Sequence, residues 1–264
     1  MKKDLIDEHD LTRDDFQLIF QRAEQLKKIL RQGVCHTSLK GKTLGMIFDK
    51  HSTRTRISFE VGMYQLGGLA LFLSSRDTQF SRGESIADAA RIMSRYLNGI
   101  MIRTYSQETV EELARHADIP VINGLTDLLH PCQILSDLFT IMEKKRTCEG
   151  LKIAYIGDGN NVANSWVNAA TRLPFHLAIA CPEGYEPDPE IFGRGVAEAA
   201  GRIRLHREPA EAVEGADVVY TDVWASMGQE SEREERLRIF RPYQVSESLM
   251  RHAKEDALVM HCLP

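Results

Sequence analysis

The stretch TLGMIFDKHSTRTRISFEVGMYQLGG, Thr43–Gly68, sets the fold class of this chain. It opens with an apolar run, Thr43–Phe48, of the length and composition of a buried strand, and it closes with a helical pattern from Thr55 to Leu66. A polar loop, HSTRTR, joins the two. A strand, a short loop and a helix in this order form the unit from which parallel α/β sheets are built.

The same alternation continues along the chain. In the first half it predicts further strands at Ala70–Leu73, Gly99–Arg103 and Pro120–Asn123, and helices at Asp14–Arg31, Ser85–Tyr96 and Glu108–His116. After the charged stretch Lys144–Gly150 it predicts strands at Lys152–Gly157, Phe175–Ala180, Arg202–Leu205, Val218–Tyr220 and Leu258–His261, and helices at Val162–Leu173, Glu190–Gly201 and Ser246–Arg251. We therefore expect an α/β protein with two doubly wound parallel-sheet domains, residues 1–146 and 147–264, and an active site in the crevice between them.

Composition excludes several classes of protein. The 264 residues carry a formal net charge of −5, which argues against a broad nucleic-acid-binding surface. Neither a secretory signal nor a run of about 20 apolar residues is present, so no membrane contact is expected. The five cysteines are far apart and form no CxxC pair, which favours a reduced, cytoplasmic protein without a zinc site.

The loop after the first strand is suited to an anion. The helix start presents free backbone N–H groups and a positive dipole end. Ser52, Thr53 and Thr55 add hydroxyl groups, and Arg54 and Arg56 add fixed charge that matches phosphate oxygens. The alternative is a simple helix cap, Ser52 or Thr53, with two surface arginines that have no partner.

A second cluster is HPCQ at His130–Gln133, where Pro131 occupies a favoured first-turn position of a helix. The histidine can donate to a carbonyl oxygen, and the glutamine amide can donate to a neighbouring group. A histidine at a helix start is otherwise a cap or a satisfied surface residue, and that alternative stays open here.

The stretch YIGDGNNVANSW, Tyr155–Trp166, follows a strand and opens a helix. Its GDGNNVA turn lacks the third glycine of the dinucleotide fingerprint, and no acidic residue follows in a ribose-binding position, which disfavours a nicotinamide cofactor. Asn160 and Asn161 instead offer amide groups suited to a polar, zwitterionic ligand.

Two further clusters follow strands of the second half. In TDVWASMGQE, Asp222 stands at a strand end where a cationic amine would bind, and Ser226 and Met227 follow it; a plain loop with a solvated aspartate is the alternative. In MHCLP, His261 adjoins Cys262 and suggests a nucleophile with its base. Adjacent strand residues point to opposite faces, so we expect His261 to be poorly placed as that base. We expect the Cys262 thiol instead to assist by hydrogen bonding.

Taken in order, the motifs STRTR, HPCQ, DGNN, DVWxSMG and HCLP resemble the ornithine carbamoyltransferases over nearly the whole chain. The aspartate carbamoyltransferases share STRTR and HPxQ but differ at DVWxSMG and HCLP. The resemblance implies a first domain that binds carbamoyl phosphate, a second that binds ornithine, and no metal or organic cofactor.

The resemblance also implies the roles of individual residues. The positions that match carbamoyl phosphate contacts are Ser52, Thr53, Arg54, Thr55, Gln79, Arg103, His130, Gln133, Cys262 and Leu263. Those that match ornithine contacts are Asn161, Asp222, Ser226 and Met227. Arg54, Arg103, His130 and Cys262 would be catalytic. Gln79 matches a glutamine that family members lend to a neighbouring subunit, which implies a homotrimer with shared sites.

The implied reaction is attack of the δ-amine of L-ornithine on carbamoyl phosphate, giving L-citrulline and phosphate, in arginine biosynthesis. The family chain normally continues past HCLP into a C-terminal helix that carries another arginine for carbamoyl phosphate, and we expect that helix to be missing here. Three rivals remain: a carbamoyltransferase for putrescine or an acylated ornithine, a non-catalytic binding protein that keeps the fold, and an NAD-dependent enzyme.

Overall fold

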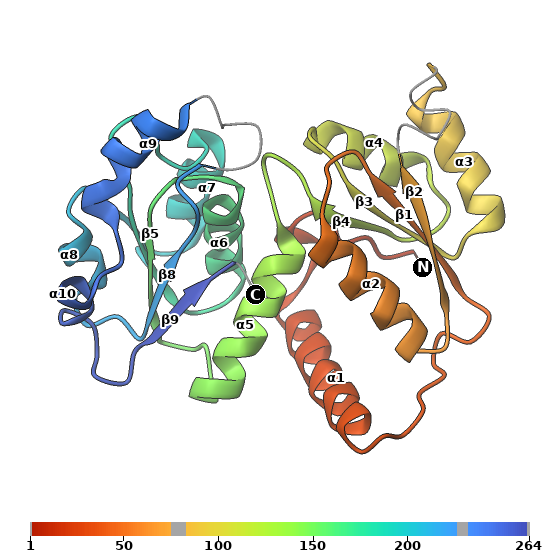
Figure 1. Cartoon of the computed structure of the whole chain (residues 1–264), viewed down its shortest axis with the longest axis horizontal. Helices are drawn as coiled ribbons and strands as arrows, with labels where there is room; N and C mark the ends of the chain where they lie inside the picture. The colour runs from red at the N-terminus through yellow and green to blue at the C-terminus, as the bar shows by residue number, and fades with distance from the viewer. Residues whose placement is uncertain (1, 75–82, 226–231, 263–264) are drawn as a thin grey trace. The chain divides into compact units, whose positions relative to one another are not determined.

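The computed structural model describes residues 2–74, 83–225 and 232–262, and the chain divides into two compact units, Met1–Cys132 and Gln133–Pro264. Figure 1 labels most of their helices and strands. The division falls at the start of one helix, α5 (Pro131–Lys145), and the boundary expected from the sequence falls at its end.

The first unit is a parallel sheet of four strands flanked by helices. Its elements are η1 (Glu8–Asp10), α1 (Arg13–Arg31), β1 (Thr43–Phe48), α2 (Thr53–Gln65), β2 (Leu69–Ser74), α3 (Ile86–Tyr96), β3 (Gly99–Arg103), α4 (Gln107–His116) and β4 (Val121–Leu125). The strand order is β2-β1-β3-β4, with every pair parallel.

Alternate residues of each strand reach opposite faces of this sheet. On β1, Ile47 packs in the cluster that includes Ala90 of α3 and Val110 of α4. Its neighbours Met46 and Phe48 pack in another cluster, with Met63 of α2. The sheet is thus covered on both faces, as the apolar runs predicted.

The second unit has a parallel sheet of five strands. Besides α5, its elements are β5 (Lys152–Ile156), α6 (Asn161–Arg172), β6 (His176–Ala180), α7 (Pro189–Glu198), β7 (Ile203–His206), α8 (Pro209–Val213), β8 (Val218–Thr221), α9 (Arg233–Phe240), η5 (Arg241–Tyr243), α10 (Glu247–Met250) and β9 (Leu258–His261). The strand order is β7-β6-β5-β8-β9, again parallel throughout.

Aromatic rings fill one face of this second sheet. Tyr155 of β5 stacks on Tyr220 of β8, with ring centroids 5.7 Å apart, and Trp166 of α6 meets the Tyr220 ring edge-on at 5.4 Å. All three side chains are fully buried. The two tyrosine hydroxyls must therefore find partners inside the protein, and both partners are residues of the site described below.

The expected α/β class with two parallel-sheet domains is confirmed. The sequence did not predict α8 or α9 as helices, and it placed only the start of α5. None of the described helices is long and apolar enough to cross a bilayer.

Candidate active site

In the first unit, the predicted anion loop lies where the strand order reverses. From the centre of the sheet, β1 leads to β2 on one side and β3 leads to β4 on the other. Connections from two such strands run in opposite directions, so their carboxyl ends leave room for a ligand. Phe48, the last residue of β1, is in register with Arg103, the last residue of β3, which brings the loop and Arg103 to the same edge.

Ser52 is the N-cap of α2. Its Oγ accepts from the backbone N–H of Thr55 at 3.3 Å and donates to Thr55 Oγ1 at 3.0 Å. The backbone N–H groups of Thr53 and Arg54 have no acceptor among the residues that the structure describes. The cap and the anion site are therefore compatible, because a capped first turn still presents two free donors.

The two arginines of the loop differ. Arg56 donates from Nε to Glu60 at 2.8 Å, and its guanidinium lies 3.9 Å from the ring centroid of Phe72. The simple-cap alternative, which left two arginines without a partner, therefore accounts for Arg56 and leaves Arg54 unexplained. Arg54 is exposed and has no partner within the described part of the chain, so its charge is available to a ligand.

Arg103 is a buried cation at the carboxyl end of β3. Its side chain makes one weak hydrogen bond, from Nη1 to Thr55 Oγ1 at 3.4 Å, and its Nε has no hydrogen-bond partner among the described residues. Burial lowers the pKa of Arg103 to about 10, so the guanidinium remains charged at neutral pH. A buried charge with an unused donor is costly, which indicates that an anionic or carbonyl ligand belongs beside it.

His130 immediately precedes α5 and is held in its neutral form. Burial, aided by the charge of Arg103, lowers the pKa of His130 to about 3. A neutral imidazole carries one N–H donor and one acceptor nitrogen. His130 can therefore donate a hydrogen bond to a carbonyl oxygen throughout the physiological pH range.

Gln133 is tied to a buried acid that the sequence did not predict. Its Nε2 donates to Oδ1 of Asp137 at 3.1 Å, and the hydroxyl of Tyr220 donates to Oδ2 of the same carboxyl at 2.7 Å. Burial raises the pKa of Asp137 to about 7, against the effect of both hydrogen bonds. Because its amide nitrogen is engaged, Gln133 has its amide oxygen left for a ligand N–H.

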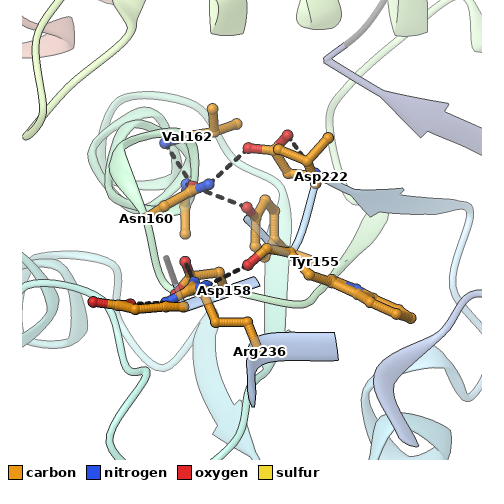
Figure 2. Close-up of polar contacts among 10 residues, drawn as sticks. Tyr155, Asp158, Asn160, Val162, Asp222 and Arg236 are labelled. Atoms are coloured by element: carbon orange, nitrogen blue, oxygen red, sulfur yellow. Dashed lines mark hydrogen bonds and ion pairs between the residues drawn. The ribbon is translucent and has the colours of Figure 1, made fainter. Parts of the chain in front are cut away.

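The second unit repeats this arrangement at its own reversal of strand order, between β5 and β8. The turn Asp158–Asn160 follows β5, and Asp222 follows β8. Figure 2 shows Asn160 between Asp222 and Tyr155, with Asp158 beside Arg236. Two strand ends thus converge on one polar cluster, as expected at a topological switch point.

Asp222 is the centre of this cluster. It is 9% exposed, and it accepts three hydrogen bonds: from Asn160 Nδ2 to Oδ2 at 2.6 Å, and from Val223 N–H and Cys262 Sγ to Oδ1 at 2.6 and 2.7 Å. A carboxylate has about four acceptor sites. One site therefore remains on Asp222 for a donor on a ligand.

Cys262 acts as a donor in this structure. Burial and the neighbouring Asp222 raise the pKa of its thiol, so the proton stays on sulfur. The expectation that His261 and Cys262 point to opposite faces is wrong, because Nδ1 of His261 lies 3.8 Å from Sγ of Cys262. The strand β9 ends at His261, so strand alternation no longer applies to Cys262. The donor atoms of Asp222, His261 and Cys262 lie within 4.8 Å of one another, yet a metal would need the thiolate that this environment disfavours.

The structure distinguishes Asn160 from Asn161. Asn160 caps α6, and Asn161 is the first residue of that helix. From the sequence, the amides of both residues were offered to a polar ligand and Asn161 alone was matched to an ornithine contact; the cap role of Asn160 was not predicted. A helix-start Asn followed by a second Asn was the available signal for the cap.

A buried ion pair was also missed. Arg236 of α9 pairs through Nη2 with Oδ2 of Asp158, and its Nε donates to the carbonyl of Trp224. The guanidinium lies 5.0 Å from the ring centroid of Tyr185. The pair joins residues 78 positions apart, so no local pattern in the sequence could have revealed it.

The glycine-rich turn after β5 serves the fold. A Cβ on Gly159 would lie 2.2 Å from the backbone of Glu186 and Pro187, and the N–H of Gly159 donates to Tyr185 O at 2.9 Å. Only glycine allows the two backbones to approach this closely. The close approach of the two backbones therefore explains Gly159, and no bound nucleotide is needed to explain it.

Four predicted site residues lie outside the described residues: Gln79, Ser226, Met227 and Leu263. Their assignments stay predictions.

Comparison with known proteins gives matches over both units. Residues 3–143 match the family model described as aspartate/ornithine carbamoyltransferase, carbamoyl-P binding domain, and residues 149–264 match the Asp/Orn binding domain of the same family.

Individual relatives agree with the family models. An ornithine carbamoyltransferase of Syntrophus aciditrophicus is 71% identical over 100% of this chain and 87% of its own length. One from Thermococcus kodakarensis is 54% identical over 99% of this chain and 84% of its own length. The solved structure of the Pyrococcus furiosus ornithine carbamoyltransferase matches with a TM-score of 0.93 at 52% identity, over 99% of this chain and 85% of that one.

Proposed function

The chain belongs to the aspartate/ornithine carbamoyltransferase family, and from that premise we propose that it transfers the carbamoyl group of carbamoyl phosphate to the δ-amine of L-ornithine. The products are L-citrulline and phosphate. Relatives that match 96% or more of the chain carry the name ornithine carbamoyltransferase.

Asp222 is the observation that carries the choice of an amine substrate. It is a buried carboxylate at the switch point of the second sheet, with one acceptor site unused. Amino groups are donors that such a site recognises. Asn161, Ser226 and Met227 complete the proposed ornithine contacts, and the motifs DVWxSMG and HCLP, in which Asp222 and Cys262 stand, favour ornithine over aspartate.

Most of the groups proposed to bind carbamoyl phosphate belong to the first unit. The phosphate oxygens accept hydrogen bonds from the free N–H groups at the start of α2 and from the hydroxyls of Ser52, Thr53 and Thr55, and they pair with the charge of Arg54. In this proposal, the carbamoyl oxygen accepts hydrogen bonds from Arg103 and His130, and the carbamoyl NH₂ donates to the amide oxygen of Gln133. Leu263 and Cys262 complete the proposed contacts.

The chemistry follows from these groups. The neutral δ-amine attacks the carbonyl carbon, and negative charge builds on the carbonyl oxygen. The bond from carbon to the phosphate oxygen then breaks, and the leaving phosphate takes the electron pair and, directly or through solvent, the proton that the amine loses. Arg54, Arg103 and neutral His130 stabilise the oxyanion and the leaving phosphate, which is usually the largest catalytic contribution.

We further propose a homotrimer, a cytoplasmic location and a role in arginine biosynthesis. The trimer is supported by an exposed apolar stripe on α2, and by the match of Gln79 to a glutamine shared between subunits. Five free thiols suit a reducing compartment. The binding groups described need neither a metal nor an organic cofactor for this reaction.

A substrate comparison tests the proposal. The purified chain is assayed with carbamoyl phosphate and, in parallel, ornithine, putrescine, N-acetylornithine or aspartate, with the carbamoylated product quantified. We expect kcat/KM for ornithine to exceed the others by about a hundredfold or more, because polar groups left unpaired by a wrong substrate penalise it strongly.

Each rival predicts a different result. A faster reaction of putrescine or N-acetylornithine would reassign the substrate. Failure to form product with any amine, with carbamoyl phosphate still bound in calorimetry, would favour a non-catalytic binding protein. Saturable binding of NAD by the same chain would favour the nicotinamide alternative.

A further inference from the structure

Asn160 makes more hydrogen bonds than a helix cap requires. Its Oδ1 accepts from the backbone N–H groups of Val162 and Ala163, at 3.0 and 3.3 Å, and from the hydroxyl of Tyr155 at 3.0 Å. Its Nδ2 lies 2.6 Å from Oδ2 of Asp222. Figure 2 shows this side chain reaching Asp222 on one side and Tyr155 on the other.

These partners determine which way the amide faces. Backbone N–H groups are donors only, so the atom that meets Val162 and Ala163 must be the amide oxygen. The amide nitrogen is then directed at Asp222, where a carboxylate oxygen accepts from it. The cap therefore prevents the amide from rotating, and the donor towards Asp222 is fixed by the fold.

The same contact limits what Asp222 can offer a ligand. Val223 and Cys262 occupy Oδ1, and Asn160 occupies one of the two acceptor sites of Oδ2. The remaining acceptor site lies on the oxygen that Asn160 holds. A shift of this oxygen would turn that site away from a bound amine.

We propose that Asn160 is a positioning residue for amine recognition: capped onto α6 and bonded to Tyr155, it holds Asp222 so that one acceptor site meets the amino-acid substrate. This inference rests on the proposed function, in which Asp222 meets an amine of ornithine. Asn160 acts through Asp222 and not on carbamoyl phosphate, so its loss should affect one substrate.

A purely structural role makes a different prediction. Ser and Asp cap helices about as well as Asn, and Thr somewhat less well, and none of them presents an amide N–H towards Asp222. If capping were the whole role of Asn160, these residues would replace it without a selective effect on ornithine.

The decisive variant is Asn160→Asp, because it is nearly isosteric and separates the two roles. One oxygen keeps the bonds from Val162, Ala163 and Tyr155, and the other faces Oδ2 of Asp222 as a second carboxylate. Two carboxylates this close favour sharing a proton. At pH 8 we expect KM for ornithine to rise about ten- to a hundredfold, the equivalent of one hydrogen bond to a charged group, with KM for carbamoyl phosphate within about twofold.

The pH dependence gives a second readout. A shared proton restores a hydrogen bond between the two carboxyls, so the ratio of variant to wild-type kcat/KM for ornithine should rise as pH falls from 9 to 6. The ratio cancels the other titratable groups around Asp222, which both proteins share. These are Cys262, His261, Tyr155, Asp137 and Asp158, the last paired with Arg236.

Two further variants keep the test decisive. Asn160→Ser retains a cap but cannot reach Asp222, so it should raise KM for ornithine at every pH without recovery in acid. Asn168→Asp makes the same substitution further along α6, where Oδ1 accepts from Arg194 at 3.1 Å, and it should leave both KM values within about twofold.

The outcomes separate this inference from the proposed function. A wild-type protein that does not carbamoylate ornithine contradicts the proposed function. An active wild type, with Asn160→Ser and Asn160→Asp unchanged or raising both KM values equally, overturns the inference alone. If Asn160→Asp fails to fold, Asn160→Ser decides by the same split between the two KM values.

Discussion

Arg103 illustrates how a single residue can serve binding at the cost of stability. The residue is 8% exposed, and its guanidinium makes one weak hydrogen bond to Thr55 and leaves Nε without a partner among the described residues. Burying a charge in this state opposes folding. The same charge is what a carbonyl oxygen or phosphate would need, so ligand binding should supply the missing partner.

Replacing Arg103 by Met should therefore separate stability from activity. We expect kcat to fall at least about a hundredfold, as for a lost oxyanion donor. Without ligands, Tm should stay unchanged or rise by about 2–4 °C, which corresponds to roughly 1 kcal/mol. Steady-state assays and thermal unfolding measure the two quantities.

The control is Arg91→Met on α3, where an exposed arginine pairs with Asp88 at 2.9 Å. Its activity should stay within about twofold of wild type, because surface ion pairs contribute little. A loss of Tm in Arg103→Met larger than that in Arg91→Met would contradict the view that the Arg103 charge opposes folding.

Asp137 predicts a pH dependence of stability. Its folded pKa is about 7 and its ordinary value is 3.8. Between these values the folded state holds a proton that the unfolded chain releases, so the free energy of unfolding falls as pH rises. At about 1.4 kcal/mol per pH unit, this fall is at most about 4 kcal/mol across the window.

Asp137→Asn removes this ionisation and should reduce the fall. Urea unfolding at pH 5, 6, 7 and 8 gives the free energy of unfolding of each protein. The difference, variant minus wild type, should increase with pH over this range. Parallel profiles for the two proteins would show that Asp137 is already ionised at pH 5.

At the scale of single residues, the sequence indicated which side chains to consider for a site but not which groups they would contact. Arg103, His130 and Asp222 were predicted from motifs, and each lies at a strand end or a helix start in the structure. Their partners were not predicted, because Tyr220 meets Asp137 only once β8 and α5 have packed. Such contacts depend on strand order, which local sequence does not encode.

At the scale of elements, α2 combines a structural cap with a proposed anion site in one residue, Ser52. Two substitutions separate these roles. Ser52→Ala removes the cap and should reduce the free energy of unfolding by about 1 kcal/mol. Ser52→Asp keeps a cap and complements the helix dipole, so stability should be retained.

The same two variants should differ in substrate binding. The carboxylate of Ser52→Asp occupies the position proposed for phosphate, so KM for carbamoyl phosphate should rise at least tenfold while KM for ornithine changes little. Denaturant unfolding and initial rates provide the measurements. An unchanged KM for carbamoyl phosphate in Ser52→Asp would place the phosphate elsewhere.

Strands were predicted more reliably than short helices for a physical reason. The run Thr43–Phe48 matches β1, whose residues after Thr43 are all buried and apolar, as expected of a central parallel strand. By contrast, α9 is largely charged, and one of the residues that it buries is an arginine, Arg236, which pairs with Asp158. A helix held by such a contact shows no apolar periodicity in its sequence.

At the scale of the whole molecule, α2 has apolar residues on two sides. Met63 packs against the sheet, whereas Ile57, Val61 and Tyr64 form an exposed stripe with the spacing i, i+4, i+7. The edge strand β2 adds the exposed side chain of Leu69. A helix with an apolar outer face is typical of a contact with another chain.

The proposed homotrimer can be tested on this stripe with Val61→Glu. Val61 is 43% exposed, so a charge is tolerated in the single chain but is costly once a second copy covers the position. Sedimentation should give the wild type the mass of three 29.9 kDa chains and the variant a lower mass. If Gln79 serves a neighbouring site, activity should fall along with the trimer fraction.

Leu18→Glu on α1 is the matched control, because Leu18 is an exposed aliphatic residue, at 65%, outside the α2 stripe. It should stay trimeric and active, since a glutamate there remains in water. A trimeric Val61→Glu protein would show that the stripe lies outside the interface between copies. A monomeric wild type with full activity would overturn both the trimer and the shared role of Gln79, because each active site would then be complete within one chain.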